Sequence, residues 1–393
     1  MAKVFLNKNE ERRLLAGHQW IFSNEIERTE DIVKNGEVAE LYAYGNKFLG
    51  KGFYNRNSLI SYRHITDKEE PIDKAFLFKR ISLANSLRKK NESCGDVYRM
   101  VNSESDFMPG LIIDRFENNF SLQIFSAGMN EFLDTITEIL KENFKANLII
   151  EKNNNELRVL EGLEKTERIL FDNSGNEDKT FITEIDSIRY KIDLLKGQKT
   201  GFYLDQTGNR RLLRKYMNER YKVLDLFCNE GGFALNAAFA GAKDITAVDS
   251  SQHSTETAKE NAALNNFQDI NFICKDVFDY LNDLFQTKER FDFIILDPPS
   301  FTKSKKNIIP ALKGYTELNA KAMRLLKPNS MLFTFSCSHH INEMNFEDAI
   351  ARSANEVKRK IQIIEYSNCS FDHPVLPQMN ETKYLKGILL RVI

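Results

Sequence analysis

The chain has 393 residues with a balanced composition, 42% hydrophobic and 28% charged, and its formal net charge is −1. This length exceeds that of one ordinary domain, and we find no long apolar run and no secretion signal, so we expect a cytoplasmic protein rather than a membrane protein. The five cysteines include no Cys-x-x-Cys pair, which argues against a disulfide scaffold and against a metal site.

The first 180 residues predict two domains. Short apolar runs broken by Gly and Asn indicate strands, and we predict a small β-rich domain over residues 1–70 with a polar linker at its end. The next domain, residues 71–180, is predicted to be α+β. Its helices are expected at residues 72–90 and 130–144, and its strands at residues 97–102, 110–116 and 120–125.

Residues 181–393 have a different pattern, in which apolar strands alternate with segments long enough to be helices. Such alternation is typical of a doubly wound sheet, so we predict an α/β, Rossmann-like domain with a seven-stranded, mostly parallel sheet. The last two runs are expected to close this sheet as a hairpin with one antiparallel strand. The expected strands are residues 222–227, 244–249, 271–276, 291–297, 331–337, 361–367 and 384–393.

A glycine turn connects the first strand of this sheet to a helix. Doubly wound sheets bind ligands at such turns, and glycine lets the backbone approach the ligand closely. A dinucleotide-dependent dehydrogenase would have the spacing G-x-G-x-x-G here, which holds a pyrophosphate, and this turn lacks it. The turn begins with Asp225 instead. A carboxylate suits a ligand with a positively charged amino group better than one with phosphates.

Two more acids stand where the second and third strands end. Asp249 can accept both hydroxyl groups of a ribose, and Asp276 can reach the amino group of an adenine. Each acid could equally cap the helix that follows it, as strand-end Asp residues often do. Three acids in register favour S-adenosylmethionine, which carries both an adenosine and an amino group.

The fourth strand ends in Asp297, which is followed by Pro298 and Pro299. Two prolines cannot continue a central strand or open a regular helix, so the chain must leave the sheet in a stiff turn. An Asp-Pro-Pro turn at this place is characteristic of methyltransferases that act on nucleobases and other planar nitrogen compounds. We therefore expect Asp297 to face a planar substrate.

Cys337 ends the fifth strand, beside Asp297 in a parallel sheet of this order. Carbon 5 of a pyrimidine is not nucleophilic enough to attack a methyl sulfonium, but thiolate addition at carbon 6 makes it so. We therefore expect Cys337 to be the nucleophile and Asp297 to bond to ring nitrogen 3. A free cysteine is more often a small buried hydrophobe, and Cys228 in the glycine turn competes for the role.

At these residues the sequence resembles the PUA-domain ribosomal RNA cytosine-5 methyltransferases of the RlmI type. The likeness covers essentially the whole chain. The resemblance implies a PUA domain at residues 1–70, a class I methyltransferase domain at residues 181–393, and 5-methylcytosine in 23S ribosomal RNA as the product. The stretches that carry the likeness are residues 15–22, 106–114, 197–206 with Asn209 and Arg210, 225–233, 296–301 and 336–338.

The resemblance also implies which residues hold the cofactor. Cys228 to Glu230 depart from the small or aromatic residues that many members have, which puts the roles of these positions in doubt. The guanine-modifying relatives share the Asp-Pro-Pro turn, so the Ser-Cys-Ser sequence around Cys337 alone carries the choice of cytosine. The implied cofactor residues are Gln198, Phe202, Asp205, Arg210, Asp225, Phe227, Gly231, Asp249, Ser250, Asp276, Val277 and Asp297.

RNA would have to bind through local basic clusters, because a net charge of −1 gives no global attraction. Ordinary solvated helix faces are the alternative for each cluster. Two other functions stay open: a ribosomal RNA guanine methyltransferase without a covalent intermediate, and an inactive RNA-binding module. A homodimer also stays open. The clusters are Lys303, Lys305, Lys306 and Lys313 after the Asp-Pro-Pro turn, and Arg210, Arg211, Arg214 and Lys215.

Overall fold

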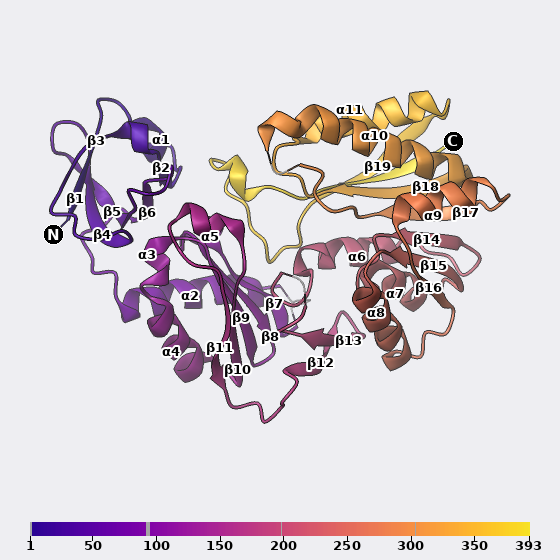
Figure 1. The fold of residues 1–393 in the computed structure, drawn as a ribbon, viewed down its shortest axis with the longest axis horizontal. Helices are drawn as coiled ribbons and strands as arrows, with labels where there is room; N and C mark the ends of the chain where they lie inside the picture. Colours follow the sequence, from indigo (N-terminus) through magenta and orange to yellow (C-terminus); the bar gives the residue numbers. More distant parts are fainter. Residues whose placement is uncertain (1, 92–94, 198, 303) are drawn as a thin grey trace. The chain divides into compact units, whose positions relative to one another are not determined.

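The computed structural model describes residues 2–91, 95–197, 199–302 and 304–393, and it divides into two units (Figure 1). The first unit comprises Met1–Thr183, Ile192–Leu204 and Phe371–Thr382, and the second comprises Glu184–Lys191, Asp205–Ser370 and Lys383–Ile393. Each unit thus includes segments that are far apart in the sequence. No helix in the described part of the chain is long and apolar enough to cross a membrane.

The first unit begins with a mixed sheet of six strands, in the order β2-β6-β5-β4-β1-β3. Strand β1 runs parallel to β4, and the other neighbours are antiparallel. Val4, Leu41 and Tyr62 lie in its core, and the hydroxyl group of Tyr62 donates to the carbonyl oxygen of Ala39 at 2.9 Å. The elements are β1 (Lys3–Leu6), α1 (Glu11–Leu15), β2 (Trp20–Ile21), β3 (Ile26–Glu30), β4 (Glu37–Tyr42), β5 (Phe48–Tyr54) and β6 (Tyr62–Thr66).

A second sheet of the first unit has five strands in the order β11-β10-β9-β8-β7, and α2 and α4 share its core. The helix expected at residues 130–144 is divided, because Phe132 leaves helical geometry between α3 and α4. The elements are α2 (Lys74–Lys89), β7 (Val97–Asn102), β8 (Leu111–Phe116), β9 (Asn119–Ile124), α3 (Ala127–Asn130), α4 (Leu133–Phe144), β10 (Leu148–Asn153), α5 (Glu156–Leu160) and β11 (Thr166–Asp172). Strands β12 (Thr180–Ile185) and β13 (Ile188–Asp193) form a separate two-stranded sheet.

The second unit contains a seven-stranded sheet in the order β16-β15-β14-β17-β18-β20-β19. The first five strands in this order are parallel, and β20 is antiparallel to both of its neighbours. The predicted seven-stranded, mostly parallel sheet with a closing hairpin is therefore confirmed. The strands are β14 (Lys222–Leu226), β15 (Asp244–Asp249), β16 (Ile270–Cys274), β17 (Phe291–Leu296), β18 (Leu326–Ser336), β19 (Ile361–Ser367) and β20 (Lys386–Val392).

Helices cover both faces of this sheet, as expected for a doubly wound fold (Figure 1). Helices α9, α10 and α11 lie on one face, and α6, α7 and α8 lie on the other. The central strands β14 and β17 are mostly apolar, apart from Lys222, Asp225 and Asp292, because both of their faces are buried. The helices are α6 (Thr207–Arg214), α7 (Gly232–Phe239), α8 (Gln252–Leu264), α9 (Val277–Phe285), α10 (Ile308–Leu325) and α11 (Glu343–Glu356).

Candidate active site

The carboxyl ends of the parallel strands bring most of the expected site residues to one edge of the second unit's sheet. Asp225 lies in β14, Asp249 ends β15, and Asp297 directly follows β17. Strand β14 pairs with both β15 and β17, so the three acids come from neighbouring strands. Cys337 directly follows β18, which is the next strand after β17 in the sheet. The edge therefore concentrates carboxylates and one thiol.

Asp225 is fully buried, with 0% of its surface exposed. Its Oδ2 accepts a hydrogen bond from the backbone N–H of Ala234 at 2.9 Å, whereas Oδ1 has no partner among the described residues. Burial raises the pKa of Asp225 to about 7; the Ala234 N–H opposes this shift, and nearby Asp297 adds to it. A group that is poorly compensated in this way favours a cationic partner.

The glycine turn after β14 holds its shape through unusual backbone angles. Phe227 and Asn229 have φ values of 65° and 47°, and Gly231 has a φ of 85°. The N–H groups of Phe227 and Cys228 both donate to the carbonyl oxygen of Val248, at 2.9 and 3.0 Å. A Cβ atom at Gly231 would also lie 3.2 Å from the side chain of Ala258, so glycine fits both the angle and the space. Gly231 thus lets the turn pack closely against α8.

Of the two strand-end acids, only Asp276 caps the helix that follows it, because the N-cap of α8 is Ser251. Asp249 accepts from the N–H of Asn229 and from that of Ser251, both at 2.9 Å. Asp276 caps α9 by accepting from the N–H groups of Phe278 and Asp279. These bonds fix the carboxylates in place. Each oxygen of Asp249 keeps a second lone pair for a ligand, and Oδ2 of Asp276, which accepts neither of these bonds, is left for one. Ser250 and Val277 follow these two acids directly, and Val277 is buried at the first position of α9.

The Asp-Pro-Pro turn and the Ser-Cys-Ser stretch contact each other. The sulfur atom of Cys337 lies 3.9 Å from the carbonyl oxygen of Pro298. The hydroxyl oxygens of Ser300 and Ser338 lie 3.0 Å apart, which joins the two loops by a side-chain hydrogen bond. Asp297 is held at the start of the turn, where its N–H donates to the carbonyl oxygen of Leu226 at 3.4 Å. The expected nucleophile therefore lies next to the expected substrate turn.

The other expected cofactor residues are placed less uniformly. Arg210 belongs to α6, lies against the glycine turn near Gly232, and lowers the pKa of Asp225. One carboxylate oxygen of Asp205 accepts a hydrogen bond from the hydroxyl group of Tyr384 at 2.6 Å. Phe202 belongs to the first unit, and its role stays a prediction. Gln198 lies outside the described residues.

Comparisons with known proteins show which family the chain belongs to. A model of a PUA-like domain matches residues 4–67, and a model of a methyltransferase domain matches residues 217–384. The ribosomal RNA large subunit methyltransferase I of Aeromonas hydrophila is 36% identical over 397 residues, which cover 99% of each chain. That of Vibrio vulnificus is 35% identical over 401 residues, covering 100% of each. The chain belongs to this family.

Solved structures similar to this family member have the same fold. One is a candidate SAM-dependent methyltransferase from Streptococcus mutans, with a TM-score of 0.84, 22% identity and 100% coverage of both chains. Another is SMU.776, a candidate methyltransferase solved with SAH, with a TM-score of 0.85, 21% identity and the same coverage. Together the comparisons confirm the predicted family, the fold class and a methyltransferase with a PUA-like domain.

The basic clusters of this family member differ in what they contact. Arg211 pairs with Asp186 at 3.0 Å, and Arg214 donates to Asn236 at 2.7 Å, so this cluster serves the fold of the second unit. The cluster after the Asp-Pro-Pro turn is exposed, and we find no ion pair for its described members. That cluster consists of Lys305, Lys306 and Lys313, while Lys303 lies outside the described residues.

Sequence reasoning missed two residues that hold the Ser-Cys-Ser stretch. The hydroxyl oxygen of Tyr315 lies 3.1 Å from that of Ser338, and the amino group of Lys386 donates to the backbone of the same stretch. The tyrosine gave no signal, because an aromatic residue on an amphipathic helix is typical of a core. The lysine gave a weak signal, because a charged residue begins the otherwise mostly apolar strand β20.

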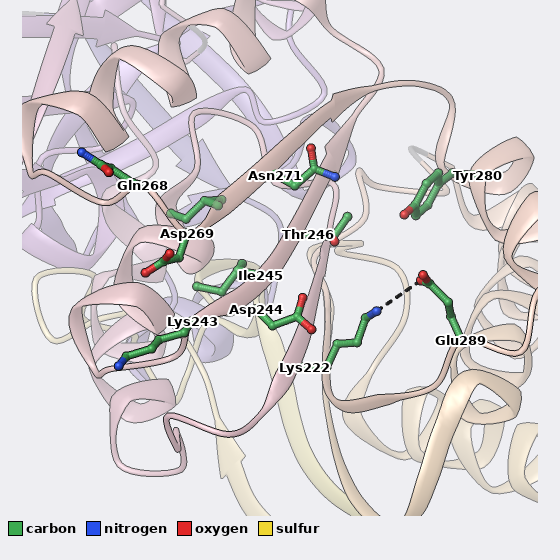
Figure 2. Close-up of a pocket in the computed structure, with 11 residues that line it drawn as sticks. Lys222, Lys243, Asp244, Ile245, Thr246, Gln268, Asp269, Asn271, Tyr280 and Glu289 are labelled. Carbon is green, nitrogen blue, oxygen red and sulfur yellow. Dashed lines mark ion pairs between the residues drawn. The ribbon is translucent and has the colours of Figure 1, made fainter.

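A separate hollow lies at the opposite edge of the same sheet (Figure 2). Its lining includes Lys222, Asp244 and Ile270, the first residues of β14, β15 and β16. Lys222 pairs there with Glu289 at 3.5 Å. Ligands of doubly wound sheets bind at the carboxyl ends of the strands, so this hollow is distinct from the candidate active site.

Proposed function

We propose that this chain methylates carbon 5 of a cytosine in 23S ribosomal RNA, with S-adenosylmethionine as the methyl donor and Cys337 as the nucleophile. The observation that carries the proposal is the thiol of Cys337 beside the Asp-Pro-Pro turn, 3.9 Å from the carbonyl oxygen of Pro298. A base whose ring nitrogen 3 faces Asp297 would present carbon 6 to that thiol. The names of the relatives support ribosomal RNA as the substrate, and such a substrate supports a cytoplasmic location.

The second unit offers groups that fit S-adenosylmethionine, which supplies an electrophilic methyl group when bound. The buried Oδ1 of Asp225, which accepts no hydrogen bond among the described residues, would accept one from the ammonium group. Asp249 and Asp276, already held by backbone N–H groups, would accept from the ribose and the adenine. SAH in the structure of SMU.776 supports this cofactor class. Within the second unit the proposed pocket comprises Asp205, Arg210, Asp225, Phe227, Gly231, Asp249, Ser250, Asp276, Val277 and Asp297. For Phe202 and Gln198 only the family resemblance supports a role.

The chain's own residues would activate the base. The thiolate of Cys337 adds to carbon 6, and the electrons of the C5–C6 double bond move onto carbon 5 and the adjoining ring atoms. A hydrogen bond between Asp297 and ring nitrogen 3, where part of this charge gathers, would stabilise the adduct. Once carbon 5 carries the methyl group, a base removes its proton. The C–H electron pair then re-forms the double bond, the S–C6 bond breaks, and the thiolate returns.

Lys305, Lys306 and Lys313 are the groups that we propose for holding the phosphates of the RNA near this site. The target base lies in folded RNA, so it has to be unstacked and moved into the pocket. The PUA-like match at residues 4–67 supports an RNA-binding role for residues 1–70. We also propose three domains, residues 1–70, 71–180 and 181–393. The PUA-like match at residues 4–67 supports the first, and the methyltransferase match at residues 217–384 supports the third.

The test is incubation of the full chain with unmodified ribosomal RNA and methyl-labelled S-adenosylmethionine, followed by nucleoside mass spectrometry. We expect labelled 5-methylcytosine from the wild type and from the control Asp269→Asn, which changes an exposed acid at the opposite edge of the sheet. Cys337→Ala should form no product. Labelled methylguanosine from an active Cys337→Ala variant would instead indicate the non-covalent guanine enzyme. No binding of S-adenosylmethionine in calorimetry would indicate an inactive RNA-binding module.

A further inference from the structure

Lys386 contacts the segment that follows Cys337. It is the first residue of β20, where it pairs with Ser336 at the end of β18, and it is only 6% exposed. Its Nζ donates to the carbonyl oxygens of Ser338 and Ile341 at 2.8 and 2.7 Å. These two bonds fix the start and the end of the turn that follows the cysteine. One buried ammonium group therefore helps to hold the turn that follows the thiol.

The positive charge of Lys386 has little compensation from the protein. Among the described residues it belongs to no ion pair, and its two hydrogen-bond acceptors are neutral carbonyl groups. The nearby carboxylate of Glu343 is already paired with Lys383 at 2.5 Å. Burial lowers the pKa of Lys386 to about 8, whereas the neighbouring Cys337 opposes this shift. A buried ammonium group without an ion pair is stabilised when a negative charge forms beside it.

We propose that Lys386 is a positioning residue that holds the turn after Cys337 and stabilises the thiolate form of this cysteine. The inference deepens the proposed function and rests on it, because the thiolate is the form that attacks a base. Other titratable groups also surround the pair. They are Tyr315 in α10, Glu343 in α11, Cys369 after β19, and Lys383 before β20.

The test measures the titration of the Cys337 thiol in the full chain. Iodoacetamide alkylation is followed from pH 5.5 to 9.5 by peptide mass spectrometry, with the exposed Cys274 as an internal reference thiol. In the wild type we expect the Cys337 midpoint to lie below that of Cys274. In Lys386→Met it should rise by about one pH unit, which makes alkylation at pH 7 about tenfold slower. Lys386→Arg should restore most of the effect, and the control Lys360→Met, at an exposed lysine beyond α11, should not change it.

The kinetics add a second readout that a general loss of folding would not give. We expect Lys386→Met to lower kcat about tenfold, with little change in KM for RNA, and we expect Lys386→Arg to recover part of kcat. The inference is wrong if Lys386→Met keeps the wild-type midpoint. It is also wrong if the wild-type midpoint is no lower than that of Cys274, a comparison that needs no variant to fold. An active Cys337→Ala variant would refute the proposed function, yet the alkylation result would still decide the role of Lys386.

Discussion

Asp225 accepts a hydrogen bond from the backbone N–H of Ala234 at 2.9 Å, while its other carboxylate oxygen is buried without a partner among the described residues. The folded protein therefore favours the protonated form of Asp225, and burial raises its pKa to about 7. An ammonium group from a ligand would reverse this preference. The site is thus built so that the apo protein is less stable when Asp225 is ionised.

The first prediction concerns stability. Because the pKa of Asp225 is raised from 3.8 to about 7, its contribution to stability is complete below pH 4 and is lost as the pH rises to about 7. Above pH 7 the penalty is on the order of 4 kcal/mol. Asp225→Asn should therefore stabilise the apo protein at pH 8 and change it little at pH 4. Urea unfolding at both pH values checks this, and equal effects at the two would contradict it.

The second prediction concerns cofactor binding at the same residue. Binding of S-adenosylmethionine should release a proton from Asp225 near pH 7, and affinity should fall about tenfold per pH unit below that value. Asp225→Asn should abolish the proton release and weaken binding by roughly 10–150-fold, the loss of one charged hydrogen bond. Calorimetry in two buffers of different ionisation enthalpy measures both. Asp269→Asn, an exposed acid at the opposite edge, is the control.

Apolar runs in the sequence predicted the sheet of the second unit because its central strands β14 and β17 are buried on both faces. The predicted strand at residues 271–276 runs two residues past β16, which ends at Cys274. Asp276 caps α9 instead, so the polar residue belongs to the turn and not to the strand. Strand-end acids could therefore be located from the sequence. Whether each one caps a helix, binds a ligand or does both depends on neighbours that the sequence does not place.

The residues around Cys337 were harder to predict because they come from distant segments. Lys386 reaches the Ser-Cys-Ser stretch only through the antiparallel register of β18 and β20, in which it faces Ser336. Tyr315 reaches the stretch from α10 by a helix packing angle that no local pattern encodes. Local patterns thus located Cys337, the proposed nucleophile, and Asp297 on the neighbouring strand, whereas tertiary packing supplies the groups that hold the Ser-Cys-Ser stretch.

The third prediction tests the link between the two active-site loops. Ser338→Ala removes the bonds to Ser300 and Tyr315, and Tyr315→Phe removes one of them. Each change should cost about 1 kcal/mol of stability and lower kcat several-fold. If the two residues act together, the stability lost by the double variant should be smaller than the sum of the two single losses. We expect a difference of about 0.5 kcal/mol or more. Urea unfolding and single-turnover kinetics provide the cycle, with Tyr280→Phe on α9 as control. Strict additivity would show that the Tyr315–Ser338 bond does not couple α10 to the Ser-Cys-Ser stretch.

The last prediction concerns the exposed lysines after the Asp-Pro-Pro turn. Lys306 lies in η5 (Lys305–Asn307) and Lys313 lies in α10, and neither forms an ion pair among the described residues. If both contact phosphates, replacing them by Ala should weaken RNA binding for all sequences and reduce the slope of log K against log salt by about 1.4. Fluorescence anisotropy at several salt concentrations measures the slope. The matched control replaces Lys358 and Lys360, two exposed lysines beyond α11, and should leave the slope unchanged. Equal slopes for both double variants would move the RNA path away from α10.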